Sequence, residues 1–220
     1  MSRNDEARHS ILSKVKEGLR ASPAQSTQPP PPARTSVADE SGLAELRAAF
    51  GKRLEQVGGC LHEVANEDSA AAAIQNILQT CGAQRVVWSD AAILTRLASH
   101  VKVGEAMREA TVPQLLSCDA AVTTAQWGVA ETGSLVLESD QENHRLASLL
   151  PPVHIAVLDS AKMLGTLGGL LERLNHKGGP APAITIITGP SRTADIELTL
   201  VVGVHGPCEL HVILCNEIEG

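Results

Sequence analysis

The segment from Ala183 to Glu197, AITIITGPSRTADIE, constrains the fold most strongly. Its β-branched apolar run stops at Gly189–Pro190 and passes directly into Ser191 and Arg192, after which a short helix is expected near 193–198. A strand that ends in a small-residue turn and opens a helix is how α/β proteins present backbone N–H groups to an anion. The segment therefore predicts a ligand-facing edge of a parallel sheet.

The surrounding pattern supports an α/β fold with a mostly parallel sheet. An apolar run at 153–158, a helical pattern at 160–174 and a second apolar run at 184–187 form the strand–helix–strand order that favours parallel pairing. The continuous apolar run at 184–187 also indicates burial on both faces. Further strands are expected at 85–88, 120–123, 134–137, 198–202 and 210–215, and further helices at 43–54, 70–81 and 90–99, the last capped by Ser89 or Asp90.

Two parts of the chain differ in composition. Residues 1–36 combine an amphipathic helix at 1–20 with a proline-rich linker that is expected to be extended or disordered, and residues 37–220 read as one α/β domain. The residues leave open whether the N-terminal helix docks on this domain, docks on a partner or frays. No apolar run approaches the roughly 18 residues that span a bilayer, and no signal-peptide core is present, so a cytoplasmic protein is expected.

Charge and cysteine usage exclude several functions. A net charge of −7 and an aromatic content of 1% argue against nucleic acid as a main partner, because phosphate binding needs a basic face and base stacking needs aromatic rings. The five cysteines include no CxxC pair. This spacing predicts reduced thiols, and it predicts that the chain alone does not bind a four-cysteine iron–sulfur cluster.

A first candidate site is the turn Glu131–Thr132–Gly133, which precedes the strand expected at 134–137. A carboxylate on a tight turn can act as base, nucleophile or hydrogen-bond acceptor, and Gly133 supplies the turn geometry. In the alternative interpretation, Glu131 and Thr132 only hold a hairpin together, with Gly133 at positive φ.

A second candidate site lies between His144 and His154. Arg145 is predicted to bind an anionic group; alternatively it pairs on the surface with an acidic neighbour such as Glu138. His154 either titrates near neutral pH in a site or is satisfied within a strand.

The third candidate site is the turn after the apolar run at 184–187, with Gly189, Ser191, Arg192 and Thr193 as predicted anion-binding residues. Ser191 suits a helix N-cap. Arg192 is not explained by capping, since a cation near a helix N-terminus is unfavourable without an anion nearby.

Farther along, His205, Cys208, His211 and Cys215 have ligand types that suit zinc, but a closed tetrahedral site is difficult to build from one turn and one strand. No metal is therefore expected, and His205 is retained as a ligand-site residue.

Three strings carry a family resemblance: AETGSLVLES, RLASLLPPVHIAVLD and ITGPSRTADIELTLVVGVHGPCELHVILCNE. Together they resemble the lactate utilization protein C family (LutC/YkgG-like), the short members of the LUD domain group. The likeness runs from Ala120 to Asn216, with one departure at Cys208, where the family pattern has a basic residue.

The resemblance implies a Rossmann-like three-layer α/β/α sandwich similar to the sugar-phosphate isomerase and CoA-transferase superfamily (NagB/RpiA/CoA-transferase-like). It also implies a cytoplasmic role in oxidising L-lactate to pyruvate beside a cysteine-rich subunit and an iron–sulfur subunit, with no cofactor in this chain. Because CoA-transferases of the superfamily use a Glu-x-Gly nucleophile, Glu131 is a loose analogue. The expected ligand is a small anionic metabolite.

The sequence leaves two other functions open. One is a stand-alone enzyme that uses Glu131 on CoA esters or sugar phosphates. The other is a metabolite-sensing regulatory or scaffold module whose N-terminal helix recruits a partner.

Overall fold

The computed structural model describes residues 3–21, 42–139, 146–176, 181–194, 200–202 and 206–216 of the 220-residue chain. It separates the chain into two compact units, Met1–Arg34 and Thr35–Gly220. The first unit contains helix α1, Arg3–Ala21, on which Ile11, Leu12 and Val15 are exposed. None of the helices in the described residues is both long and apolar enough to cross a membrane. The proline-rich linker expected after α1 lies outside the described residues.

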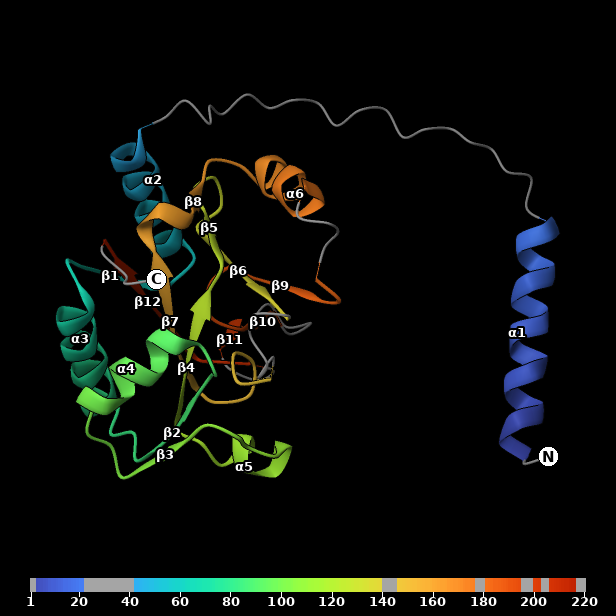
Figure 1. Ribbon diagram of the computed structural model, residues 1–220, viewed down its shortest axis with the longest axis horizontal. Helices are drawn as coiled ribbons and strands as arrows, with labels where there is room; N and C mark the ends of the chain where they lie inside the picture. Colours follow the sequence, from blue (N-terminus) through green and yellow to red (C-terminus); the bar gives the residue numbers. More distant parts are fainter. Residues whose placement is uncertain are drawn as a thin grey trace. The chain divides into compact units, whose positions relative to one another are not determined.

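A six-stranded parallel sheet forms the centre of the second unit (Figure 1). Its order is β1-β12-β7-β4-β2-β3, and every neighbouring pair runs parallel. The strands are β1 Cys60–Val64, β2 Arg85–Trp88, β3 Glu105–Met107, β4 Ala120–Ala125, β7 Val153–Asp159 and β12 Glu209–Cys215. The expected α/β architecture with a mostly parallel central sheet is thereby confirmed.

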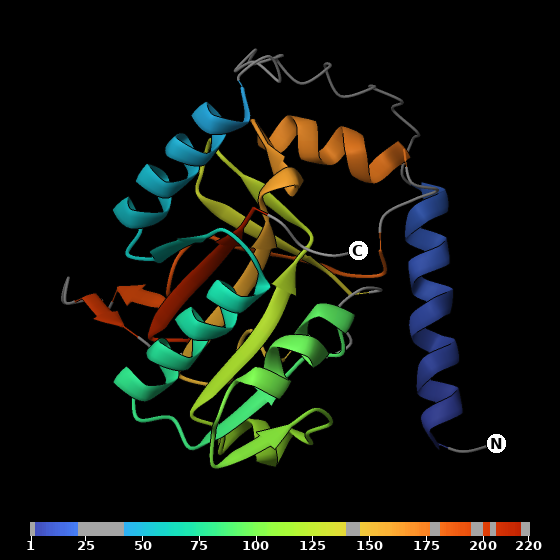
Figure 2. The ribbon, with the colours of Figure 1, turned by 60° about the vertical axis from the view of Figure 1, so that its left-hand side comes forward.

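Two helices cover one face of this sheet, as Figure 2 shows: α3, Glu67–Thr80, and α4, Ala92–His100. Alternation along β7 explains the packing, because Val153, Ile155 and Val157 join the core beneath these helices while Ala156 and Leu158 join the core on the opposite face. Both faces of β7 are buried, so its sequence is an uninterrupted apolar run.

The opposite face is covered by a smaller sheet together with helix α2, Leu43–Gln56. This sheet has the order β8-β5-β6-β9, with β5 Trp127–Val129, β6 Ser134–Glu138, β8 Met163–Leu164 and β9 Ile184–Ile187. Helix α6, Leu167–His176, packs on its outer side through Leu170 and Leu174. Helix α5, Val112–Leu116, covers the edge near β2 through Leu115.

Four expectations about local structure are wrong. The strand at 184–187 does not pair with 153–158 in one parallel sheet: β9 pairs antiparallel with β6, and Ile186 is 47% exposed. The helix expected at 160–174 is interrupted, because Asp159 caps a single 3-10 turn at Ser160–Lys162 and the chain then pairs with β5 as β8.

The helix expected near 193–198 is also absent where the structure describes the chain. Residues Arg192–Ala194 form strand β10, which pairs antiparallel with β11, Leu200–Val202. Finally, α4 begins at an Ala91 N-cap without a side-chain cap, so neither Ser89 nor Asp90 is its N-cap residue.

Candidate functional site

The turn at Glu131 joins β5 to β6 and holds the start of α6. Gly133 has φ +68°, the left-handed conformation expected for it. The exposed Glu131 carboxylate accepts a hydrogen bond at 3.2 Å from the backbone N–H of Leu167, the first residue of α6. An acidic group is stabilising at a helix N-terminus because it compensates the unpaired N–H groups there. This contact gives Glu131 a structural explanation.

We expect Glu131→Gln to lower the free energy of unfolding by less than about 1 kcal/mol, because the amide oxygen still accepts the Leu167 N–H and only the charge–dipole attraction is lost. Urea denaturation of the two proteins measures the difference. Glu131→Ala, which removes the acceptor, serves as the comparison and should cost about 1 kcal/mol. A loss above about 2 kcal/mol for the glutamine variant would contradict this structural role.

A chain of three hydroxyl groups connects this turn to the turn after β9. The Oγ1 of Thr132 lies 2.7 Å from the Oγ of Ser134, and that Oγ lies 2.7 Å from the Oγ1 of Thr188. Ser134 is buried, so the two bonds replace contacts with water. The chain of hydroxyls brings Thr132 into the same network as the residue that precedes Gly189.

The turn after β9 lies against the carboxyl end of α2. Gly189 has φ +86°, and a Cβ atom built on it would lie 2.7 Å from the carbonyl oxygen of Val57. Next in the chain, the N–H of Ser191 donates to the carbonyl of Pro207 at 2.8 Å, so Ser191 ties this turn to the segment before β12 instead of capping a helix. The close approach to α2 and the positive φ both require glycine at position 189.

Arg192 follows on β10 and is exposed, with its guanidinium Nη2 against Gly58. Gly58 comes just after α2, at the negative end of the helix dipole. A cation is favourable at that end of a helix. Among the described residues, Arg192 lies on β10 and not at the expected helix N-terminus, and its place beside the end of α2 suits a cation.

A cavity of about 220 Å³ lies between the six-stranded sheet and β9. It is bounded by the start of β7 and β12, by β9 and its following turn, and by two short loops: its lining residues are Ser148, Leu149, His154, Thr185, Ile186, Ile187, Thr188, Gly189, Ser191, Gly206, Pro207 and Leu210. Two of the predicted ligand residues, Gly189 and Ser191, line it. Glu131, Thr132, Gly133 and Arg192 do not belong to this lining.

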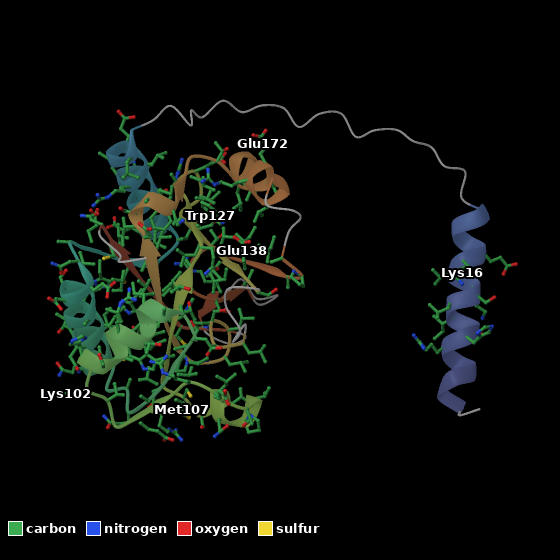
Figure 3. All side chains as sticks on the ribbon, in the orientation of Figure 1. Lys16, Lys102, Met107, Trp127, Glu138 and Glu172 are labelled. Atoms are coloured by element: carbon green, nitrogen blue, oxygen red, sulfur yellow. The ribbon has the colours of Figure 1, made fainter. Side chains whose placement is uncertain are left out.

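Three predicted residues lie wholly or partly outside the described residues. Arg145 and His205 are not described, and Thr193 is described only through its backbone in β10. The acidic residue Glu138 is buried rather than on the surface, and one of its carboxylate oxygens accepts from Trp127 Nε1 at 2.8 Å (Figure 3). Lys162 and Arg173 lie 5.6 and 4.8 Å from the centroid of the same indole ring.

His154 is the one titratable side chain among the described lining residues of the cavity, and it is fully buried. Its Nε2 lies 2.9 Å from the Oγ1 of Thr123 on the neighbouring strand β4. The other ring nitrogen, Nδ1, has no hydrogen-bond partner within the described part of the chain. Burial lowers the pKa of His154 to about 4, so the expectation of titration near neutral pH is wrong.

The sequence could have pointed more firmly to His154. Positions 154, 156 and 158 share one face of β7, and Ala156 and Leu158 are buried in the core on that face. A histidine that continues an apolar face must find partners inside the protein. The sequence does not reveal that Nε2 pairs with Thr123 while Nδ1 has no hydrogen-bond partner among the described residues.

The histidines and cysteines near the C-terminal end adopt a different arrangement from a tetrahedral site. His211 Nδ1 lies 3.1 Å from His62 Nε2 on the adjacent strand β1, and His211 Nε2 lies 3.2 Å from a Glu209 carboxylate oxygen. Cys208 is exposed and Cys215 is buried. Among the described residues, no three His, Cys, Asp or Glu side chains are grouped to hold a metal ion.

Comparison with known proteins identifies the family. The sequence model of the LUD domain matches residues 47–215, which include the central sheet and the cavity. The chain belongs to the LUD domain family. This confirms the resemblance drawn from the three sequence strings.

Relatives of this LUD-domain chain include several proteins named for lactate utilization. The lactate utilization protein C of Halalkalibacterium halodurans is 34% identical over 162 residues, covering 68% of this chain and 70% of that protein. An uncharacterized protein of Neisseria meningitidis is 43% identical over 97 residues, which is 43% of this chain and 41% of the relative's length.

A solved structure also matches the LUD domain. The crystal structure of a DUF162 family protein from Deinococcus radiodurans superimposes with a TM-score of 0.59 at 23% identity, covering 80% of this chain and 99% of the other. At that identity, the likeness supports the fold alone.

Proposed function

We propose that this LUD-domain protein is a component of a bacterial-type lactate utilization system. The observation that carries the proposal is the 34% identity over 162 residues to the lactate utilization protein C of H. halodurans. The alignment covers 68% of the chain, enough to include most of the domain that the LUD model matches. A shared domain at this identity supports a shared system more strongly than a shared fold would.

The chemistry of lactate oxidation indicates which role belongs to this chain and which to its partner subunits. Oxidation of L-lactate to pyruvate removes two electrons and two protons, as one hydrogen from carbon 2 and one from its hydroxyl group, so it requires an electron acceptor. The five cysteines of this chain include no CxxC pair, which does not fit an iron–sulfur cluster with closely spaced ligands. We therefore assign electron transfer to cysteine-rich and iron–sulfur partner subunits in the cytoplasm, and to this chain the binding of a small carboxylate- or phosphate-bearing ligand.

The cavity beside β9 supports the ligand-binding part of the proposal. Gly189 and Ser191, both predicted to bind a ligand, line it together with the buried His154. Small-molecule sites are concave and combine apolar walls with a few placed polar groups, which is the composition of this lining. Arg145, Thr193 and His205 remain predicted ligand residues.

A deletion in the organism that encodes this chain tests the proposal. We expect the deletion strain to lose growth on L-lactate as sole carbon source and to keep growth on pyruvate, because only the oxidation step is blocked. Growth is restored by the wild-type gene, and a tagged copy purifies together with cysteine-rich and iron–sulfur proteins. Unimpaired growth on L-lactate, in a strain without a second copy of the gene, would refute the proposal.

A further inference from the structure

Strand β9 has one backbone edge that no other strand of the described residues pairs with. It ends the order β8-β5-β6-β9, and β6 is its partner on the other side. The N–H of Ser139 donates to the carbonyl of Ala183, so every second residue from Ala183 onward directs its backbone groups toward β6. The carbonyl of Val136, opposite Ile186, accepts from the β5 side, in agreement with this alternation. Ile184 and Ile186 therefore direct their N–H and C=O groups to the free edge.

The side chains along this edge do not prevent pairing with another strand. Residues 178–191 include no charged residue, and β9 itself reads ITII. Ile186 points to the outer face of the small sheet and is 47% exposed, because α6 packs chiefly against β5 and β8. Natural proteins usually protect a free edge with charged side chains, proline or a bulge. Here Pro182 and Pro190 lie on either side of the strand, which leaves residues 183–188 open to a further strand.

The cavity beside β9 follows the same edge. Its lining includes the four consecutive residues 185–188. Side chains of consecutive strand residues point to opposite faces, so a cavity lined by all four runs along the edge of the strand and not along one face alone. Thr185 and Ile187 contribute from the inner face, and Pro207 and Leu210 line the cavity as well. The cavity therefore leaves room beside the backbone of β9.

Charge favours a second copy of this chain as the occupant. The net charge is −7, so two copies repel each other wherever their acidic surfaces meet. The uncharged segment 178–191 is where contact between copies costs least. A strongly charged partner strand, by contrast, would find no opposite charge on this segment.

The pattern of β9 is also complementary to itself. Opposite residues of an antiparallel pair point to the same face of the sheet. A two-fold axis beside Thr185 then sets Ile184 of one copy opposite Ile186 of the other, and both isoleucines point to the outer face. These are the residues whose backbone groups face the free edge, so the same register aligns the hydrogen bonds and the apolar side chains.

We propose that β9 pairs antiparallel with β9 of a second copy, which joins two four-stranded sheets into one continuous sheet across a two-fold axis at Thr185. Ile184 exchanges backbone hydrogen bonds with Ile186 of the second copy, and the outward isoleucines of both copies form one apolar cluster. Thr185 of the second copy lies beside the cavity-lining Thr185. This interface is independent of the role in lactate utilization, which the deletion strain tests separately.

Analytical ultracentrifugation of the full-length protein measures its assembly state. We expect a species of twice the chain mass in the micromolar concentration range. A wild-type protein that stays monomeric throughout this range overturns the proposal.

Ile186→Lys places a charge in the centre of the interface. The side chain is exposed, so the fold of the single chain tolerates lysine, while the dimer would have to bury two ammonium groups in an apolar cluster. We expect the dimer to dissociate about tenfold or more readily. Leu171→Lys on α6, at a leucine that is 55% exposed, is the matched control and should leave the dimer unchanged.

Ile186→Pro tests the backbone contact itself. Proline removes the N–H of residue 186, which faces the free edge and makes no bond to β6, so the single chain should remain folded. Each copy then loses a donor and leaves a carbonyl of the other unpaired, and we expect about tenfold or more weakening of the dimer. Ile186→Val keeps the N–H and the β-branched shape and should remain dimeric. Thermal unfolding of each variant establishes that it is folded, and Ile186→Lys decides the test if the proline variant is not.

Hydrogen–deuterium exchange tests which surface forms the dimer. A peptide covering residues 183–188 should exchange more slowly at concentrations that favour the dimer than after dilution. A peptide covering β6, whose backbone bonds lie within one chain, should not change. A dimer whose 183–188 peptide is unprotected, or one that persists in folded Ile186→Lys, overturns the proposed pairing.

Discussion

Gly133→Ala is expected to lower the free energy of unfolding of the LUD domain by about 3 kcal/mol, since two costs add. The residue has φ +68°, a conformation that alanine adopts with strain. In addition, a Cβ atom at this position would overlap the backbone of α2, at Leu54 N and, at 2.7 Å, at Arg53 C. Helix backbone cannot rotate away as a side chain can, so α2 must shift. Urea denaturation followed by circular dichroism measures the loss.

Gly82→Ala is the matched control. Gly82 has a nearly identical φ of +66°, but a Cβ atom there meets nothing within 4 Å. Only the conformational cost remains, and we expect a loss of about 1 kcal/mol. Equal losses in the two variants would show that the approach of the turn to α2 contributes nothing, and would contradict the arrangement of this turn beneath the helix.

The local pattern of apolar residues predicted several strands correctly, because a run of apolar residues in the sequence is itself the signal for a buried strand. Strand β2 has the same bounds as expected, 85–88, and the apolar run at 153–158 is a strand that is buried on both faces. The bounds of β9 are also correct. Its partner is not, because pairing joins residues far apart in the chain: β9 lies beside β6 rather than in the large sheet.

The segment after Gly189 shows why a local sequence pattern can predict the wrong secondary structure. Ser191 followed by acidic residues is a sound N-cap pattern. In the structure, the backbone of Arg192–Ala194 pairs with Leu200–Val202, and Ser191 N–H donates to Pro207. These partners lie later in the chain, so the residues next to Ser191 in the sequence do not predict the pairing.

The candidate site follows the same rule. Sequence predicted turns at Gly133 and Gly189 and a positive φ at Gly133, and both glycines have positive φ in the structure. It did not reveal that Glu131 accepts a hydrogen bond from the first N–H of α6, nor that His154 is a buried residue of the cavity lining. Both depend on contacts between elements that are far apart in the chain.

Acidification is the second test with a large expected effect. Burial lowers the pKa of His154 to about 4 from the model-peptide value of 6.5. Between these values, the unfolded chain binds a proton at this residue and the native protein does not. The free energy of unfolding therefore rises with pH in this window, and the contribution of His154 is lost as pH falls from 6.5 to 4. The total loss expected from this residue is about 3 kcal/mol.

The double variant His154→Leu with Thr123→Val isolates this contribution. Carboxylates also titrate below pH 5, and the pKa of His62 is lowered by its burial and by His211, but these groups are present in both proteins and cancel in the difference. Urea denaturation at intervals from pH 7 to pH 4 should show the wild type losing about 3 kcal/mol more than the variant. Parallel pH profiles would mean that His154 accepts a proton in the native protein as readily as in the unfolded chain. That result would contradict the buried, neutral state of the His154 imidazole in the native protein.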